Sequence, residues 1–274
     1  MKRALLTLAV LAATCAPAGA AEPVTYDALG GEYVGLKPTA VGLPQIGGAG
    51  SFGAGELSTP LREYHDSGAY ADDLGQVGDA ARAYLNQRLA ENSAPKRKVC
   101  RKRFRHVRGN LFRRVRKCRR KAPPRLTGKP AIVLDIDETS LSNYDGLSAS
   151  NFSASGLVAP AVAGTGTAID PTLALFKLAK QRNVAVFFIT GRPEAVRGPT
   201  EANLRAEGYE DWDGLILKPS GPGTQEYKAG ERKKLETQMG YDVIVNMGDQ
   251  ESDLDGGFAD RGFKLPNPFY FIAD

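Results

Sequence analysis

The stretch from Ala131 to Thr139 constrains the fold of this chain more than any other: the apolar run AIVL leads directly into Asp135-Ile136-Asp137. An unbroken apolar run of this kind is typical of a strand buried on both faces, such as the central strand of a parallel sheet. The two carboxylates then lie at its carboxyl end, where open α/β sheets bind their ligands. Like charges so close need a cation between them or a shared proton, although an acidic turn after a strand would give the same pattern.

Strands and helices alternate after this run. We expect further strands at 184–189, 214–217 and 243–245, with helices at 171–181, 193–207 and 231–239. This order predicts an α/β fold with a doubly wound parallel sheet and right-handed crossovers. Residues 140–170 show no clear helix or strand, so we expect a functional lid there. Upstream, apolar residues at three- and four-residue steps between Ser58 and Glu91 predict two helices that brace the sheet.

Five segments follow from composition. Residues 1–21 carry Lys2-Arg3, a short apolar run and Ala18-Gly19-Ala20, the features of a secretory signal peptide. After it we expect a flexible Gly/Pro-rich leader (22–60), the N-terminal helices (61–95), a basic insert (96–125) and the core domain (126–274). Cys15 follows Thr14 rather than a small residue, which argues against a lipid anchor. No later run approaches 18 apolar residues, so we expect no membrane span and a protein that is secreted, periplasmic or held in the cell envelope.

The basic insert concentrates the positive charge. Of the 36 Lys and Arg residues, 15 lie between Lys96 and Lys121, where no Asp or Glu occurs. The rest of the chain is therefore acidic, although the formal net charge is +5. A patch of this kind can bind nucleic acid, acidic polysaccharide or a charged envelope surface. A merely solvated charged face is the other interpretation.

Cys100 and Cys118 are the only cysteines after the signal peptide. In an exported protein a disulfide between them is favoured over a two-cysteine metal site. Apolar residues in the insert recur at helical steps, but a continuous helix would hold the cysteines about 27 Å apart. Gly109-Asn110 offers a break midway, so we predict a disulfide-stapled helical hairpin, stabilised by about 3 kcal/mol.

Polar side chains follow every expected strand of the core domain. They are Asp135 and Asp137, then Thr190-Gly191-Arg192, then Lys218 with Lys228 beyond it, and finally Asp249 and Asp253. Because the carboxyl ends of parallel strands meet at one edge, these groups should converge on a single site. The set suits phosphoryl transfer, which needs a carboxylate nucleophile, a second carboxylate as acid and base, and a hard cation such as Mg²⁺. A hydroxyl, free amides and a lysine can bind the phosphoryl oxygens.

The motifs also resemble a known family. Asp135-x-Asp137-x-Thr139, Thr190-Gly191-Arg192, a downstream lysine and Gly248-Asp249-x-x-x-Asp253 are similar to the four motifs of the haloacid-dehalogenase superfamily. More narrowly, the segments 134–144 and 248–254 resemble the class B-like acid phosphatases, the branch that includes plant acid phosphatases and vegetative storage proteins. The resemblance covers roughly residues 60–95 and 129–274, and leaves out the basic insert and the leader.

The resemblance implies a role for each matching residue. Asp135 would be the nucleophile and a metal ligand, and Asp137 the general acid and base, with its backbone carbonyl on the metal. Asp249 would be a further ligand to Mg²⁺, and Asp253 a direct or nearby partner. Thr190, with Gly191 and Arg192, would bind the phosphoryl group. Lys228 is the preferred lysine, with Lys218, Lys233 and Lys234 as alternatives. An acid at 137 favours a phosphatase over the superfamily's dehalogenases, which lack it, and its transport ATPases, which carry Thr there.

Several residues allow two interpretations. Tyr144 and Phe152 could stack on a nucleobase or aromatic leaving group, or could cover the core. Asp253 could simply cap a helix. His65 and His106 lie outside the constellation, which argues against a histidine acid phosphatase.

The function that follows is a secreted, Mg²⁺-dependent acid phosphatase that hydrolyses phosphomonoesters, nucleotides among them, through an aspartyl-phosphate. One alternative is a polyanion- or cell-envelope-binding protein whose basic hairpin is the functional part. A catalytically idle storage protein on the same scaffold is disfavoured because both Asp135 and Asp137 are present.

Overall fold

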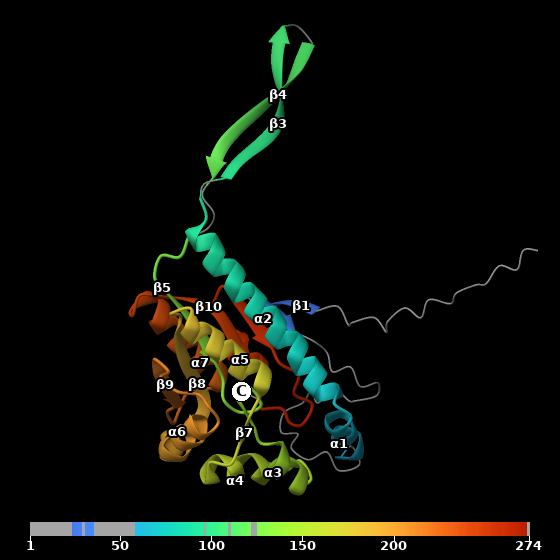
Figure 1. Ribbon diagram of the computed structural model, residues 1–274, viewed down its shortest axis with the longest axis vertical. Helices are drawn as coiled ribbons and strands as arrows, with labels where there is room; N and C mark the ends of the chain where they lie inside the picture. The colour runs from blue at the N-terminus through green and yellow to red at the C-terminus, as the bar shows by residue number, and fades with distance from the viewer. Residues whose placement is uncertain are drawn as a thin grey trace, which may run out of the picture.

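One sheet organises the molecule. The computed structural model describes residues 24–28, 31–35, 58–95, 97–108, 111–121 and 125–272. Within them the main sheet has the strand order β1-β2-β11-β10-β5-β8-β9 (Figure 1). Its strands are β1 (Val24–Ala28), β2 (Gly31–Gly35), β5 (Lys129–Leu134), β8 (Ala185–Pro193), β9 (Gly214–Lys218), β10 (Tyr241–Gly248) and β11 (Arg261–Lys264). All neighbouring strands run parallel except β1 and β2, so the expected parallel α/β sheet is confirmed.

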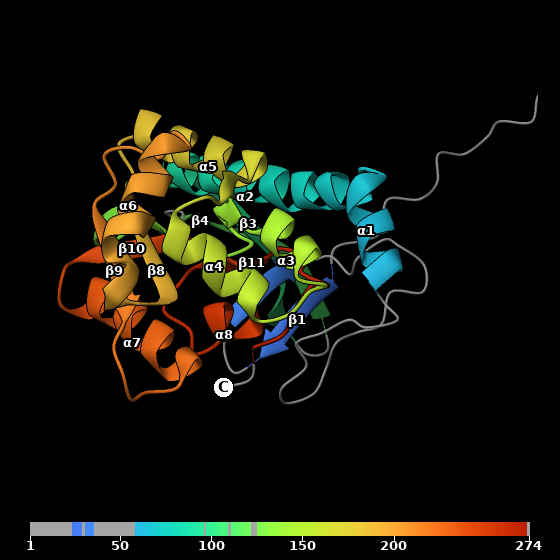
Figure 2. The ribbon, with the colours of Figure 1, turned by 90° about the horizontal axis from the view of Figure 1, so that it is seen from below.

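Helices cover both faces of this sheet. The long helices α2 (Ala69–Ser93) and α5 (Asp170–Gln181) lie together over one face, and α7 (Thr224–Thr237) lies on the other (Figure 2). The remaining helices of the core are α6 (Arg197–Ala206), which follows a 3₁₀ turn at Glu194–Val196, and the short α8 (Glu251–Leu254). With α1 (Ser58–Asp66), α2 confirms the two expected N-terminal helices. Helix α7 begins at Thr224, earlier than the predicted start at Glu231.

Strand β5 is buried on both faces, as its sequence indicates. Ile132 and Leu134 point into the larger core with α2 and α5, while Ala131 and Val133 point into the smaller core beneath α7. All four side chains are 2 % exposed or less. Because alternate residues pack against opposite layers, a slip by one residue would exchange every contact, and the position of Asp135 is thereby fixed.

The segment expected to lack regular structure contains helices. Strands β6 (Leu141–Ser142) and β7 (Thr167–Ala168) pair at its base, and between them lie α3 (Tyr144–Ala149) and α4 (Ser155–Ala163). The two helices pack closely at Gly146 and Gly156: a Cβ on Gly146 would lie 2.7 Å from the Gly156 carbonyl oxygen. Sequence patterns missed these helices because α3 is short and α4, which contains Pro160, has no alternation of polar and apolar residues.

The predicted flexible leader is partly wrong. Residues 24–28 and 31–35 form β1 and β2, which extend the sheet beyond β11. The predicted signal peptide at 1–21 and the other leader residues up to 57 lie outside the described residues. Of the helices that the structure does describe, none is long and apolar enough to cross a bilayer.

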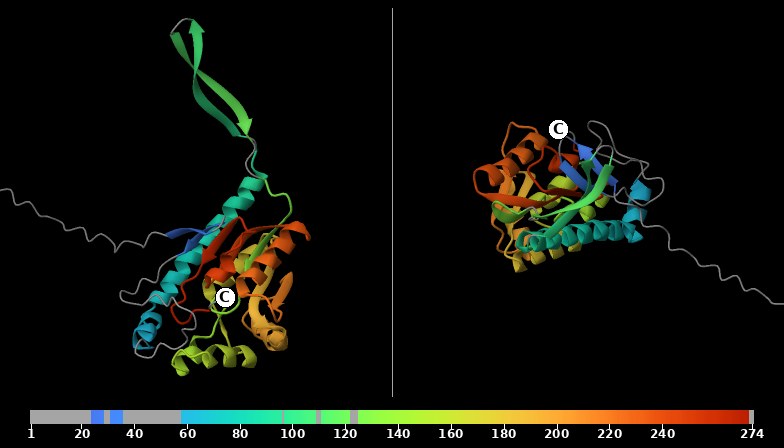
Figure 3. Two further views of the ribbon diagram at one scale, coloured as in Figure 1. Left: turned by 180° about the vertical axis from the view of Figure 1, so that it is seen from behind. Right: turned by 90° about the horizontal axis from the view of Figure 1, so that it is seen from above.

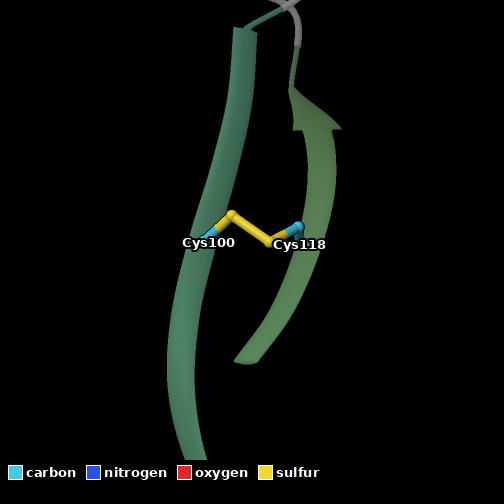
Figure 4. The surroundings of a disulfide bond; sticks show 2 residues. All are labelled: Cys100 and Cys118. Atoms are coloured by element: carbon cyan, nitrogen blue, oxygen red, sulfur yellow. A yellow bond between two sulfur atoms is a disulfide. The ribbon is translucent and has the colours of Figure 1, made fainter. Parts of the chain in front are cut away.

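The basic insert is a β-hairpin, so the predicted helical hairpin is wrong. Strands β3 (Arg97–Arg108) and β4 (Leu111–Lys121) pair antiparallel and stand away from the body (Figures 1 and 3). Cys100 lies directly opposite Cys118, and the predicted disulfide joins them (Figure 4). The cysteines are nine residues on either side of Gly109, and in an antiparallel ladder residues equidistant from the turn face each other. The equal spacing of the two cysteines about Gly109 was therefore the sequence feature that indicated paired strands.

We expect the disulfide to protect this hairpin. In the unreduced protein from residue 22 onward, no thiol should react under denaturing conditions, and two should react after reduction. Cys118→Ser should expose one thiol and speed tryptic cleavage within 97–121 severalfold, because an isolated two-stranded ribbon is marginally stable in water. Val99→Ser, an exposed change on the partner strand β3 of the same hairpin, serves as the control. Two reactive thiols before reduction would contradict the assignment.

Candidate active site

Three carboxylates meet at the carboxyl end of the sheet. Asp135 follows β5, Asp249 follows β10, and Asp253 lies in α8. One carboxylate oxygen from each lies within 4.8 Å of the others, and all three residues are buried. The expected convergence of these segments is therefore present.

Lys228 supplies the positive charge among these acids. Its Nζ, carried by α7, donates to Asp135 Oδ1 at 2.6 Å and to Asp253 Oδ1 at 2.5 Å. Burial alone would lower the pKa of this ammonium, but the two carboxylates raise it above its ordinary value. Burial also raises the pKa of Asp135 well above the usual range, with Lys228 opposing and the neighbouring acids reinforcing the shift. One ammonium cannot balance three carboxylates, so the site favours a further cation.

Asp249 is held by three side chains. Gln250 Nε2 and Asn267 Nδ2 each donate to its Oδ2 at 2.6 Å, and Thr139 Oγ1 donates to its Oδ1 at 3.3 Å. Burial and the charge of Asp253 raise the pKa of Asp249 to about 6, although the hydrogen bonds from Gln250 and Asn267 oppose the shift. The carboxylate therefore has a fixed orientation before any ligand arrives.

Asp253 both caps a helix and belongs to the cluster. Its Oδ2 accepts the Gln250 backbone N–H at 2.8 Å in a capping box, while its Oδ1 faces Lys228. The buried guanidinium of Arg232 donates to the carbonyls of Asp253, Leu254, Asp255 and Gly257, which holds the turn after α8 in place. Gly248 has to be a glycine here, because a Cβ would collide with the Asp253 side chain.

Asp137 lines the same cavity and has hydrogen-bond partners of its own. Arg192 donates to it through Nη2 at 2.7 Å and through Nε at 3.1 Å, and Asn143 Nδ2 donates to Oδ1 at 2.9 Å. Arg192 is itself buried, with Nη1 on Thr200 Oγ1 at 3.1 Å. Its guanidinium thus orients Asp137, a contact that the sequence interpretation, which placed Arg192 on the substrate, did not anticipate.

A cavity of about 430 Å³ opens over these groups. Its lining includes all four aspartates with Lys228, Gly191, Arg192 and Lys218. Thr190 is fully buried beside it, with its Oγ1 accepting the Arg192 backbone N–H at 3.1 Å. Tyr144 lies elsewhere: its ring stacks on His65 with 3.3 Å between centroids. Phe152 is buried in the core. Lys233 and Lys234 are exposed and do not line the cavity.

The donor set fits a hard divalent cation. Asp135, Asp249 and Asp253 offer only oxygen atoms, which Mg²⁺ and Ca²⁺ prefer. The hydrogen bonds from Gln250 and Asn267 resemble the outer contacts that orient ligating carboxylates in metal sites.

Sequence reasoning missed several residues that hold this site. Asn143 and Gln250 lie inside the recognised motifs, so their proximity to Asp137 and Asp249 was the available signal. Arg232 follows Lys228 by four residues and so shares its face of α7. Asn267, in the segment Pro266-Asn267-Pro268 after β11, carried no sequence signal.

Comparison with known proteins agrees with this geometry. A family model for the HAD superfamily, subfamily IIIB (acid phosphatase), matches residues 105–273. The chain belongs to this family. The match begins within β3, so it takes in part of the basic hairpin, which the resemblance had left out, and does not extend to the N-terminal helices.

Two relatives of this chain are plant proteins. A stem 28 kDa glycoprotein from Glycine max is 37% identical over 155 residues, which are 53% of this chain and 61% of the relative. Acid phosphatase 1 from Solanum lycopersicum is 37% identical over 157 residues, 53% of this chain and 60% of the relative. The chain thus spans about three fifths of the length of these relatives.

A solved structure supports the fold. The class C acid phosphatase from Bacillus anthracis superposes with a TM-score of 0.57, covering 78% of this chain and 86% of that one. At 18% identity, this likeness establishes the HAD-like fold alone.

Because Lys228 lies among buried carboxylates, we expect the loss of its positive charge to destabilise the fold. Lys228→Met should lower the free energy of unfolding by about 3 kcal/mol or more, because it leaves buried carboxylates without their partner. Lys218→Met, which removes a lysine for which no ion pair is found among the described residues, should change it by less than about 0.5 kcal/mol. Urea denaturation followed by circular dichroism, without divalent cations, measures both. Equal midpoints for the two variants would contradict the central role of Lys228.

Proposed function

We propose that this protein is an exported, Mg²⁺-dependent acid phosphatase that hydrolyses phosphate monoesters through an aspartyl-phosphate. The observation that carries the proposal is the convergence of Asp135, Asp249 and Asp253, with Lys228 bonded to the first and the last, in a cavity that Asp137 also lines. This combination supplies a nucleophile, an acid and base, and a cation site within one pocket.

The reaction takes two steps. A carboxylate oxygen of Asp135 attacks phosphorus, the ester P–O bond breaks, and Asp137 protonates the departing alkoxide. In the second step Asp137 takes a proton from water as that water attacks the phosphorus of the aspartyl-phosphate. Orthophosphate leaves and the Asp135 carboxylate is restored. Arg192 and Asn143 hold Asp137 in one orientation throughout.

The remaining groups bind charge. Lys228, the Thr190 hydroxyl and the backbone near Gly191 and Arg192 would receive the phosphoryl oxygens. Asp135, Asp249 and Asp253, with the backbone carbonyl of Asp137, would hold the cation. When bound, Mg²⁺ reduces the repulsion between an anionic nucleophile and an anionic phosphate.

Export is supported by three observations. The first 21 residues have the pattern of a signal peptide. Cys100 and Cys118 form a disulfide, which persists in oxidising compartments. One relative is named a stem glycoprotein.

The catalytic proposal predicts a specific loss. The wild-type protein should hydrolyse a chromogenic phosphate ester, lose that activity in EDTA and regain it with Mg²⁺. Asp135→Asn should lower kcat by at least about 10³-fold, because an amide cannot serve as the nucleophile, while thermal unfolding stays cooperative. Asp72→Asn, on the exposed face of α2, is the matched control. Turnover by Asp135→Asn near the wild-type rate would remove Asp135 as the nucleophile.

A second candidate function belongs to the basic hairpin, which we propose binds a polyanion. In the described part of the chain, β3 and β4 pair only with each other. Their register sets like charges directly opposite one another, as in Lys98 with Arg120 and Lys102 with Arg116. Such pairs destabilise a ladder, so a bound polyanion would relieve repulsion that the hairpin itself leaves uncompensated.

The hairpin lies far from the cavity in which the reaction would take place. It leaves the body after α2 and returns to the start of β5, whereas the cavity lies at the carboxyl ends of the strands. In Figures 1 and 3 the hairpin and the α3–α4 lid lie at opposite ends of the molecule. The hairpin would therefore localise the enzyme without contacting the scissile phosphate.

Heparin chromatography tests this second function. Replacing the exposed residues Lys98, Arg101 and Lys102 with Gln should lower the salt concentration needed for elution. The same number of exposed charges removed elsewhere, at Lys177, Arg182 and Lys233, gives the control. Equal shifts in the two triple variants would mean that only net charge matters, and would contradict a dedicated binding hairpin.

A further inference from the structure

The active-site cavity has a charged floor and an aliphatic wall. The floor consists of the aspartates and Lys228. The wall is one face of α4, which contributes Leu157, Val158, Ala161 and Val162 at helical spacing. Helix α4 contains no charged residue, so a group leaving the floor along this wall meets hydrocarbon rather than hydrogen-bonding partners.

The apolar side chains of this wall are exposed to solvent. Val158 is 59% and Val162 is 55% exposed, and Ile272, which also lines the cavity, is 37% exposed. These are three of the five large apolar side chains that stand exposed in the described part of the chain. Exposed apolar residues scattered singly are ordinary, but their collection at the mouth of one cavity marks a binding surface.

Aromatic stacking does not account for the wall. Among the described residues that line the cavity, Tyr270 is the one aromatic residue, and it is 2% exposed. Tyr144 stacks on His65, and Phe152 is fully buried. The surface is therefore shaped for aliphatic chains rather than for the flat face of a nucleobase.

We propose that this aliphatic wall binds the leaving group of the substrate, and that the preferred substrates are phosphate monoesters of unbranched alkyl alcohols. The proposal rests on the phosphatase function above. With the phosphoryl group on the floor, an alkyl chain that follows α4 covers Val158 and Val162. A polyhydroxylated leaving group would instead place its hydroxyls against hydrocarbon and lose hydrogen bonds to water.

A homologous series of substrates tests this. Ethyl, butyl and hexyl phosphate have leaving groups of nearly equal intrinsic reactivity, so kcat/KM compares their binding in the transition state. We expect kcat/KM to rise roughly twofold for each added methylene, which is part of the gain for full burial. Glycerol 3-phosphate should fall well below butyl phosphate. A flat series, with glycerol 3-phosphate equal to butyl phosphate, would overturn the proposal while leaving the phosphatase function intact.

Substitution locates the effect. The double variant Val158→Ser/Val162→Ser should lower the ratio of kcat/KM for hexyl phosphate to that for ethyl phosphate at least fivefold. Val99→Ser, the same kind of change at a valine that is 38% exposed on the distant hairpin, should keep the wild-type ratio. An unchanged ratio in the double variant would overturn the assignment to α4. Sedimentation tests the other possible partner of the wall, which is a second copy of the chain. A wild-type dimer that dissociates in the double variant would make the wall an interface between two copies instead.

A binding measurement keeps the two proposals distinguishable. If the wild-type protein hydrolyses none of these esters, the phosphatase function fails. Calorimetry with non-hydrolysable phosphonates then tests independently whether the wall binds alkyl chains. Hexylphosphonate binding at least fivefold more tightly than methylphosphonate, with the difference lost in the double variant, supports the aliphatic wall. Equal affinities for the two phosphonates would overturn it.

Discussion

The ammonium of Lys228 between Asp135 and Asp253 is the interaction on which the rest of the site depends. Buried carboxylates repel one another and lose hydration, so they can share a small volume only if positive charge lies among them. The three partners come from the residue that follows β5, from α7 and from α8. Their contact therefore ties the central strand to the helix beneath it and to the turn beyond β10.

Helix α7 has a second role through the same face. Arg232, one turn beyond Lys228, binds the carbonyl groups that end α8, and burial lowers the pKa of its guanidinium to about 10. One helix thus places an ammonium between two of the acids and fixes the segment that carries Asp253. Arg192 does the corresponding work for Asp137 from the end of β8. Each acid of the site is oriented by a buried cation or amide rather than by solvent.

The molecule separates its tasks in space. The carboxylate floor of the cavity and its aliphatic wall on α4 lie at the carboxyl end of the strands. The basic hairpin leaves the body from the opposite end. Its two strands are joined to each other by a disulfide and by the hydrogen bonds of their own ladder. A change in either part should leave the other largely unaltered, because the ladder of β3 and β4 is separate from the main sheet in the described chain.

The sequence determined the features that depend on local pattern. The apolar run before Asp135 specifies a strand buried on both faces, and the order of strands and motifs specifies a parallel sheet with its acids at one edge. It also determined that Cys100 and Cys118 pair. Only the tertiary structure decided what depends on contacts between distant segments. Arg192 binds Asp137, Asn267 reaches Asp249, and Tyr144 packs on His65 instead of facing the cavity. The insert forms strands because its two halves pair with each other, and α4 forms without a polar face because α3 packs against it. Periodicity along one segment carries no information about which partner that segment will meet.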